Sequence, residues 1–248
     1  MYNLGLIGGN LSHSFSKAYF DKKFQNNKIK NFSYSLLPLN HIKLIDELIK
    51  NKKLIGFNVT SPYKEIIIQY IDKLGPIATI TKSVNTVFIN SKNEKIGFNT
   101  DFIGFQSILD NLNINNPKAL ILGSGGVSKT ISYSLKLKQI KYCIVSRKPR
   151  INMKKYSEIN NMMDDCKLII NTTPLGQYPI INNAPKIPYN LITNKHCCID
   201  LIYNPKKTLF LKKAEAQGAQ VINGKQMLIK QAEKAWEIWN HLITKDYV

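Results

Sequence analysis

The chain contains 248 residues, of which 44% are hydrophobic and 21% are charged, so it can bury a sizeable core in one or two domains. No apolar run reaches the ~20 residues that a membrane-spanning helix needs. The first residues also lack the basic segment and the long apolar run of a secretory signal. We therefore expect a cytoplasmic protein that has no membrane partner.

The formal net charge is +19, which raises the question of nucleic-acid binding. Arg147 and Arg150 are the only arginines among the 35 basic residues, and the lysines are spread along the chain singly or in pairs. No basic tail is present, and no basic stretch is interleaved with aromatic residues. This pattern is typical of lysines on solvated faces, so we expect no nucleic-acid partner and a field that attracts small anionic substrates.

The four cysteines lie in or beside apolar, strand-like runs, and none forms a C-x-x-C pair. They are Cys143, Cys166, Cys197 and Cys198. The four histidines are scattered along the chain. Buried, reduced thiols explain this pattern better than disulfides or a metal site, so we expect no bound metal.

The first hundred residues alternate between strand-like and helix-like patterns. Tyr2–Ile7 is the first predicted strand, and the helix after it carries apolar residues that include Phe20 and Phe24. The next predicted elements are a strand Phe32–Leu37, a helix from about Ile42 to Lys50, a strand Leu54–Val59, a helix with Pro62 near its first turn, a strand Ser83–Val87 and a helix from near Phe102.

Polar side chains gather where these predicted strands end, which is the edge at which open α/β sheets bind ligands. Ser14 and Ser16 precede the first helix, where they would act as N-caps or, together with free N–H groups, as a carboxylate pocket. The neighbouring His13 is interpreted as a structural histidine beside a turn. The other members of these clusters are Asn58, Thr60, Lys64, Asn85, Asn99 and Asp101, and Asn99 or Asp101 could equally cap the next helix.

A glycine-rich turn follows the apolar strand Ala119–Leu122, and a helical pattern then starts near Val127. The turn consists of Gly123, Ser124, Gly125 and Gly126. A strand, a glycine turn and a helix place backbone N–H groups and a helix N-terminus against a phosphate. Such turns also occur as plain structure, so this one predicts a dinucleotide site only together with its context.

The strand predicted at Tyr142–Val145 indicates which dinucleotide to expect. An NAD-binding chain usually carries Asp or Glu about 20 residues after the glycines, where it binds the ribose hydroxyls. This chain has Ser146, Arg147, Lys148 and Arg150 instead. A hydroxyl and a guanidinium suit a 2′-phosphate, which a carboxylate would repel. The cofactor predicted from these residues is therefore NADP.

The remaining predicted elements belong to the same half of the chain. They are strands over residues 167–171, 197–202 and 221–222, a helix over 209–217 closed by Gly218, and a helix over 227–239. An irregular loop, rich in Pro and Asn, is predicted over residues 178–188. Trp236 and Trp239 in the last helix are interpreted as core residues.

The chain resembles the shikimate dehydrogenases from Gly8 to Ala232, through motifs that follow one another in the family's order. Each motif is weak alone, but the complete series is specific. The motifs are His13–Ser16, Gly56–Lys64, Val84–Thr86, Asn99–Gly104, the glycine turn, Asn171–Gly176, Asp200–Pro205 and Gly224–Ala232.

This resemblance implies the NADP-dependent interconversion of 3-dehydroshikimate and shikimate, a step of the shikimate pathway to chorismate and the aromatic amino acids. It implies that Ser14 and Ser16 hold the substrate carboxylate. The residues that it places at the ring hydroxyls or close to the substrate are Thr60, Asn85, Asp101, Gln231 and Tyr203. The cofactor contacts that we add from the matching motifs are Val127, Thr172, Leu201, Gly224 and Met227.

The resemblance also assigns proton transfer to Lys64, working beside Asp101. Hydride addition to a ketone leaves developing negative charge on the oxygen, which an ammonium group can stabilise and protonate. A neighbouring carboxylate would favour the charged form of Lys64, and the two groups would titrate as a pair.

The element order and the resemblance together predict an α/β fold with two domains and a cleft between them. Residues 1–101 would form a substrate domain with an open, mostly parallel sheet, completed by the C-terminal helix 226–248. Residues 102–225 would form a Rossmann-type NADP-binding domain. The sequence leaves the oligomeric state open, and a homodimer is one compatible state.

Some positions depart from the family pattern. Asn10 and Lys17 stand where the family commonly has proline, and Thr173-Pro174 replaces a frequent Ala/Thr-Ser pair. Two alternatives stay open. A quinate/shikimate dehydrogenase could use the same residues, although such relatives tend to favour NAD. A regulatory or binding homologue could keep the cleft without turnover, although it would not need both Lys64 and Asp101.

Overall fold

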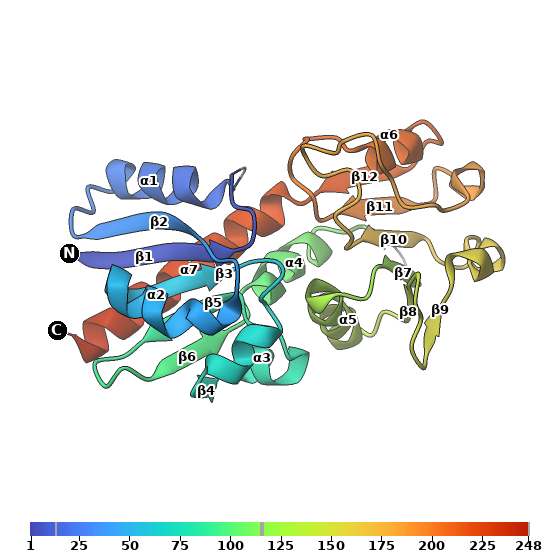
Figure 1. The fold of residues 1–248 in the computed structure, drawn as a ribbon. Coiled ribbons are helices and arrows are strands. Elements are labelled where there is room, and N and C mark those ends of the chain that lie inside the picture. Colours follow the sequence, from blue (N-terminus) through green and yellow to red (C-terminus); the bar gives the residue numbers. More distant parts are fainter. Residues whose placement is uncertain (13, 115–116, 248) are drawn as a thin grey trace. The chain divides into compact units, whose positions relative to one another are not determined.

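The computed structural model describes residues 1–12, 14–114 and 117–247. They divide into two compact units (Figure 1). The first unit comprises Met1–Thr100 together with Gln231–Val248, and the second comprises Asp101–Lys230. Each unit has its own six-stranded sheet and its own hydrophobic core, so each is described by itself.

The sheet of the first unit is mostly parallel. Its strands are β1 (Tyr2–Gly8), β2 (Phe32–Pro38), β3 (Leu54–Val59), β4 (Lys73–Leu74), β5 (Thr86–Ile89) and β6 (Lys95–Phe98). They pair in the order β2-β1-β3-β5-β6-β4. Only β5 runs against its neighbours β3 and β6, and the other pairings are parallel. β1 carries the run of buried residues that is typical of a strand covered on both faces.

Helices cover both faces of this sheet (Figure 1). Aromatic and aliphatic side chains of α1 (Ser16–Asn26) and α7 (Lys225–Asp246) pack on one face, around Phe20 and Trp239. On the opposite face, Phe57 and Ile67 lie in a core that also includes residues of α2, η2 and α3. The elements of that face are the 3-10 helices η1 (Ile42–Leu44) and η2 (Ile66–Tyr70) and the α-helices α2 (Ile45–Lys52) and α3 (Pro76–Thr81).

The sheet of the second unit is entirely parallel across its described pairings. Its strands are β7 (Ala119–Leu122), β8 (Tyr142–Val145), β9 (Met153–Lys154), β10 (Leu168–Asn171), β11 (Cys197–Asp200) and β12 (Gln220–Asn223). They lie in the order β9-β8-β7-β10-β11-β12. Numbered from β7, this order is 3-2-1-4-5-6, which is the strand order of the Rossmann fold.

Helices also flank the second sheet. α4 (Asp101–Leu109), α5 (Gly126–Leu137) and the start of α7 pack against one face, around Phe105 and Ile131. α6 (Leu209–Glu215) covers the other face, together with the 3-10 helices η3 (Tyr156–Glu158) and η4 (Asn160–Met162), around Phe210. A third 3-10 segment is η5 (Tyr189–Leu191). The predicted α/β class, with a mostly parallel sheet and a Rossmann-type unit, is confirmed.

The prediction of a helix with Pro62 near its first turn is wrong. Residues 61–65 contain turns, and the only helical segment between β3 and β4 is the five-residue 3-10 helix η2. Pro62 disfavours helical backbone at Ser61, and three consecutive β-branched isoleucines at 66–68 are poor helix formers. Lys64 therefore sits in a turn rather than on a helix.

Other differences are smaller. The strand predicted at Ser83–Val87 spans Thr86–Ile89 instead. The short elements α3, β4 and β9 follow no clear period in the sequence, and the predictions omit them. The last helix runs to Asp246, beyond the amphipathic pattern over 227–239 and close to the range 226–248 predicted for the C-terminal helix.

The cysteines are free thiols, and Cys166, Cys197 and Cys198 are buried while Cys143 is partly exposed. The prediction of buried, reduced thiols therefore holds for three of them. Burial raises the pKa of Cys166 to about 11 and that of Cys197 to about 12. Among the described residues there is no group of side chains placed to hold a metal ion. None of the helices over those residues is long and apolar enough to cross a membrane.

Candidate active site

The predicted substrate residues of the first unit meet at one edge of its sheet. β1, β3 and β6 run in the same direction and end at this edge, whereas β5 runs the other way and begins there. Ser14 and Ser16 follow β1, Thr60 and Lys64 follow β3, and Asn85 immediately precedes β5. The topology thus gathers residues from three separate motifs at one place.

The two serines lie at the start of α1. Both are half-buried, and the Oγ of Ser14 accepts a hydrogen bond from the backbone N–H of Ser16 at 3.2 Å. Phe15, the residue immediately before α1, provides no capping side chain. His13, the first residue of the motif, lies outside the described residues.

The turn after β3 is tied to its neighbours by backbone hydrogen bonds. The N–H of Thr60 donates to the carbonyl of Ile7 at 2.9 Å, and the N–H of Val84 donates to the carbonyl of Lys64 at 2.8 Å. The hydroxyl of buried Tyr63 donates to the carbonyl of Leu39 at 2.6 Å. These bonds fix the backbone that carries Lys64, which is half-buried, next to the residues that precede β5.

A buried polar network surrounds Asn85. Its Oδ1 accepts from the backbone N–H of Thr100 at 2.7 Å and from the Thr100 hydroxyl at 3.1 Å. Its Nδ2 donates to Oε1 of Gln231, on α7, at 3.3 Å. The first unit therefore brings Asn85 and Gln231, which are 146 positions apart in the chain, into direct contact.

Three residues of this network were not predicted as site residues from the sequence. They are Thr100, which donates to Asn85, and Tyr34 and Thr86, which bond to the amide of Asn58, itself a donor to the carbonyl of Asn85. Thr86 and Thr100 lie inside the family-like motifs, and that location is the signal that could have found them. Tyr34 sits in an ordinary strand pattern, so no sequence signal marks it.

Asp101 and Tyr203, the other two predicted substrate residues, belong to the second unit. Asp101 is the first residue of α4 and is buried, with 5% of its surface exposed. Tyr203 lies in the loop after β11 and is half-buried.

The predicted cofactor residues of the second unit follow the carboxyl ends of its parallel strands. Gly123 follows β7, Ser146 follows β8, Thr172 follows β10, Leu201 follows β11 and Gly224 follows β12. Because all of these strands are parallel, their carboxyl ends form one edge, where Rossmann sheets bind dinucleotides. β7 and β10 are also the neighbours between which the strand order reverses.

The glycine turn leaves the N-terminus of α5 open. Gly123 has a φ of +114°, and a Cβ there would approach Thr172 Oγ1 to 2.6 Å, so the tight turn requires glycine. A Cβ on Gly125 would meet nothing within 4 Å. No side chain caps α5, and its first turn has no acidic residue, so its N–H groups and helix dipole can receive an anion.

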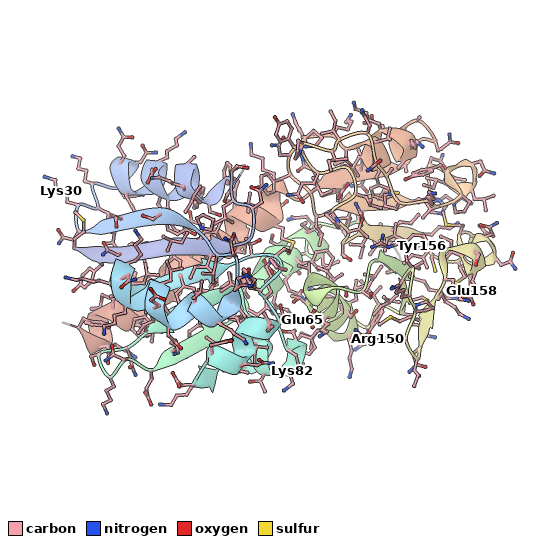
Figure 2. All side chains as sticks on the ribbon, viewed as in Figure 1. Lys30, Glu65, Lys82, Arg150, Tyr156 and Glu158 are labelled. Atoms are coloured by element: carbon pink, nitrogen blue, oxygen red, sulfur yellow. The ribbon has the colours of Figure 1, made fainter. Side chains whose placement is uncertain are left out.

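The segment after β8 carries hydroxyl and positive groups. The Oγ atoms of Ser146 and Ser124 are 3.0 Å apart, which links this segment to the glycine turn. Arg147, Lys148 and Arg150 are all exposed. Burial raises the pKa of Tyr156, and the positive charge of Arg147 nearby partly opposes this effect. Figure 2 labels Arg150, which precedes β9 in the chain, and Tyr156, which follows it.

Two of the assigned cofactor residues are packed rather than open. Val127, in the first turn of α5, is half-buried against a core that contains Met227, which is 6% exposed and lies against Gly104. Thr172 is half-buried, and its hydroxyl donates to the carbonyl of Leu122 at 2.8 Å.

A buried carboxylate joins three of the segments at this edge. Asp200 accepts hydrogen bonds from Thr208 Oγ1 at 2.5 Å, from Asn171 Nδ2 at 3.1 Å and from the N–H of Ile202 at 3.1 Å. Burial raises the pKa of Asp200 to about 6, against the lowering effect of these bonds. From the sequence, Asp200 was named only as the first residue of a family motif and was given no role, although an Asp that ends an apolar strand is a signal for one.

Comparison with known proteins identifies the family. A family model described as the shikimate dehydrogenase substrate binding domain matches residues 6–87. A curated shikimate dehydrogenase (NADP(+)) from Clostridium beijerinckii is 40% identical over 250 residues, which cover 95% of this chain and 90% of the relative. The chain belongs to the shikimate dehydrogenase family.

Solved structures of shikimate dehydrogenases have the same fold. One, in complex with NADP+, gives a TM-score of 0.86 at 28% identity and covers 99% of this chain and 96% of its own. Another, from Thermus thermophilus in complex with NADP(H) and shikimate, gives a TM-score of 0.84 at 26% identity, with coverage of 98% and 94%. The resemblance predicted from the motifs is confirmed along the whole chain.

Proposed function

We propose that the protein is an NADP-dependent oxidoreductase that interconverts 3-dehydroshikimate and shikimate in the cytoplasm, as a step of the shikimate pathway. The observation that carries this proposal is the family match over 95% of the chain, combined with the two sheet edges described above. One edge presents the serines, Lys64 and the paired amides of Asn85 and Gln231. The other presents an open helix N-terminus.

The residues of the second unit fit NADP. The pyrophosphate would lie against the N–H groups of the glycine turn, where the side of Gly125 that a Cβ would occupy is open. The 2′-phosphate would be held by Ser146, Arg147, Lys148 and Arg150, a segment that contains no carboxylate. Contacts with Val127, Thr172, Leu201, Gly224 and Met227 complete the proposed cofactor site. NADP supplies or accepts the hydride when it is bound.

The substrate is an anion with a ring that carries oxygen atoms, and the proposed contacts match that chemistry. Ser14 and Ser16, at the start of α1, would hold the carboxylate. Thr60, Asn85 and Gln231 would bind ring oxygens. Asp101 and Tyr203 complete the proposed substrate set by the family resemblance.

Lys64 is the proposed proton-transfer residue, with Asp101 as its partner. In the reduction direction, the carbonyl oxygen gains negative charge as the ring carbon receives hydride. The ammonium group of Lys64 stabilises that charge and donates its proton to the oxygen, giving the hydroxyl of shikimate. In the oxidation direction, the neutral amine accepts the hydroxyl proton as hydride leaves the carbon.

Substrate binding and cofactor binding are proposed for different segments of the chain. Residues 1–101 and 226–248 would bind the substrate, and residues 102–225 would bind NADP. The small anionic substrate and the cofactor would be the partners of the chain, without nucleic acid or membrane. A homodimer stays a prediction.

An oxidation assay tests the function. The purified protein, given shikimate and NADP, is expected to produce reduced nicotinamide absorbance together with an equal amount of 3-dehydroshikimate. Absence of turnover with both shikimate and quinate, using either nicotinamide cofactor, would contradict the proposal and favour a binding or regulatory homologue.

A further inference from the structure

Asp200, the last residue of β11, is a buried carboxylate between two segments of the proposed site. None of its surface is exposed, and the same holds for its partners Asn171 and Thr208. Asn171 ends β10 and is the register partner of Asp200 in the parallel pair of β10 and β11. The two side chains therefore meet where both strands end, at the edge that is proposed to bind the cofactor.

Oδ1 of Asp200 holds the ends of both strands. Asn171 Oδ1 accepts from the N–H of Thr173 at 3.0 Å, and because an N–H can only donate, the amide nitrogen of Asn171 must face Asp200. That nitrogen donates to Asp200 Oδ1 at 3.1 Å, and the N–H of Ile202 donates to the same oxygen at 3.1 Å. One oxygen atom therefore links the segments that follow β10 and β11.

Oδ2 of Asp200 has a different partner. It accepts from Thr208 Oγ1 at 2.5 Å, and Thr208 Oγ1 in turn accepts from the N–H of Leu211 at 3.3 Å, which caps α6. This bond joins the carboxylate to a helix that carries none of the proposed site residues. The bonds of Oδ2 and of Oδ1 can therefore be removed separately.

The backbone of Ile202 is fixed at both of its polar groups. Its N–H is bonded to Asp200, and its carbonyl accepts from the N–H of Gly224 at 3.1 Å. Gly224 lies so close that a Cβ on it would come within 2.0 Å of the carbonyl oxygen of Leu201. Ile202 stands between Leu201, a proposed cofactor contact, and Tyr203, a proposed substrate contact. Fixing Ile202 therefore fixes the backbone that leads to both.

We propose that Asp200 is a positioning residue, whose Oδ1 holds Leu201 and Tyr203 in place for the cofactor and the substrate at the same time. This inference rests on the proposed function. Because Asp200 is fully buried, it acts through the backbone of Ile202 rather than by contact with either ligand. Its loss should weaken the binding of both ligands together. A residue needed only for folding would instead lower the amount of active enzyme and leave both KM values unchanged.

Asp200→Ala removes both oxygens, whereas Asp200→Asn keeps an oxygen that can accept at the position of Oδ1. At pH 8, above the pKa of about 6, the wild-type carboxylate is ionised. At this pH, Asp200→Ala is expected to raise the KM for NADP and the KM for shikimate about tenfold each, the order of magnitude of one hydrogen bond to a charged group. Asp200→Asn should recover most of both losses, because its amide oxygen still accepts from Ile202.

Thr208→Val is the matched control. It removes the bond to Oδ2 and the cap of α6 but leaves both bonds to Oδ1 in place. Thr208→Val and Asp200→Ala should both lower the melting temperature, and only Asp200→Ala should raise the two KM values. Unchanged KM values in a folded Asp200→Ala variant would overturn the inference, and so would equal increases in Thr208→Val. An inactive wild type would instead contradict the proposed function.

A calorimetric titration of the ligand-free protein with NADP needs no turnover. The Kd for NADP should rise about tenfold in Asp200→Ala and stay at the wild-type value in Thr208→Val. If Asp200→Ala does not fold, Asn171→Ala takes its place, because it removes one of the two bonds to Oδ1 and leaves Thr208 bound to Oδ2. Asn171→Ala should raise this Kd about threefold. An unchanged Kd in the folded variant would overturn the inference.

Discussion

Lys64 is held by its backbone while its side chain stays half-exposed. The carbonyl of Lys64 accepts from the N–H of Val84, and the neighbouring Tyr63 is anchored to Leu39. A lysine whose backbone is fixed and whose side chain is not part of the core can be replaced with little effect on folding. Its proposed role in proton transfer can therefore be tested separately from stability.

Lys64→Ala is expected to lower kcat by roughly 10²- to 10⁴-fold, the range that general acid–base catalysis contributes. The melting temperature should stay close to that of the wild type. Exposed Lys50, on α2, provides the matched control, and Lys50→Ala should keep wild-type rates. Steady-state kinetics and thermal unfolding measure both effects. A turnover number equal to that of the wild type would refute the assignment of Lys64.

Arg147 is the residue on which the preference for NADP over NAD should depend most. Arg147→Ala is expected to raise the KM for NADP by about 10- to 100-fold, the strength of a hydrogen bond to a charged group, and to change the KM for NAD far less. Lys141→Ala, an exposed charge before β8, controls for the general loss of positive charge. Equal effects of Arg147→Ala on the two cofactors would refute the 2′-phosphate assignment.

At the residue scale, the sequence predicts chemistry better than contacts. The types of Ser14, Ser16, Lys64 and Asn85 and their places at strand ends made them candidates, and the family resemblance assigned their roles. The direct contact between Asn85 and Gln231 required the path of α7, which no local pattern contains. Tyr34 could not be found, because a tyrosine in an alternating strand is usually part of the core.

In the turn between β7 and α5, Gly123 and Gly125 are glycines for different physical reasons. Gly125 has an extended backbone, with φ −81° and ψ −177°, and has open space where a Cβ would be. Gly125→Ala should therefore leave thermal stability unchanged but raise the KM for NADP about tenfold or more, because the methyl group occupies the approach to the helix N-terminus.

Gly123→Ala is the companion variant. At a φ of +114°, with Thr172 Oγ1 at 2.6 Å from the added Cβ, alanine is strained and crowded. It should lower the free energy of unfolding by about 1–3 kcal/mol as well as weaken NADP binding. If Gly125→Ala destabilised the protein as much as Gly123→Ala and left the KM for NADP unchanged, the open anion site before α5 would be disproved.

Asp200 makes the stability of the second unit depend on pH. Its pKa is about 6 in the folded protein and 3.8 without the fold. Between these values the folded state binds more protons than the unfolded state, so stability falls as pH rises through this window. Relative to Asp200→Asn, the free energy of unfolding of the wild type should fall by up to about 3 kcal/mol from pH 4 to pH 7.

Denaturant unfolding at a series of pH values measures this difference. Asp164→Asn is the control, because Asp164 is exposed and its hydrogen bond to Lys167 lowers its pKa, so its small effect should have the opposite sign. A wild type and an Asp200→Asn variant that change in parallel with pH would show that burial does not raise the pKa of Asp200.

Most long elements were predictable, and the short ones were not. The strands Leu54–Val59, Ala119–Leu122 and Tyr142–Val145 have the predicted bounds, because each is a compact apolar run that the sheet buries. The segment after β3 was misassigned, because its proline was interpreted as a helix start. Two-residue strands such as β4 and β9 exist only through pairing with distant strands, which no local period records.

For the whole molecule, composition indicated the class of protein, and the topology of the two sheets determines where the site residues lie. Charge and hydropathy favoured a folded protein that attracts small anions, and the ordered motifs predicted the family. The Rossmann strand order and the single antiparallel strand of the first sheet came from the structure. They explain how motifs scattered over the whole chain meet at two sheet edges.

The central claim is that this chain oxidises shikimate with NADP, and one set of initial rates tests it most directly. Rates of nicotinamide reduction should be measured for shikimate and quinate, each with NADP and with NAD. The highest kcat/KM is expected for shikimate with NADP, because the segment after β8 carries Arg147 and no carboxylate. A higher kcat/KM for quinate with NAD, or no turnover in any of the four combinations, would contradict the claim.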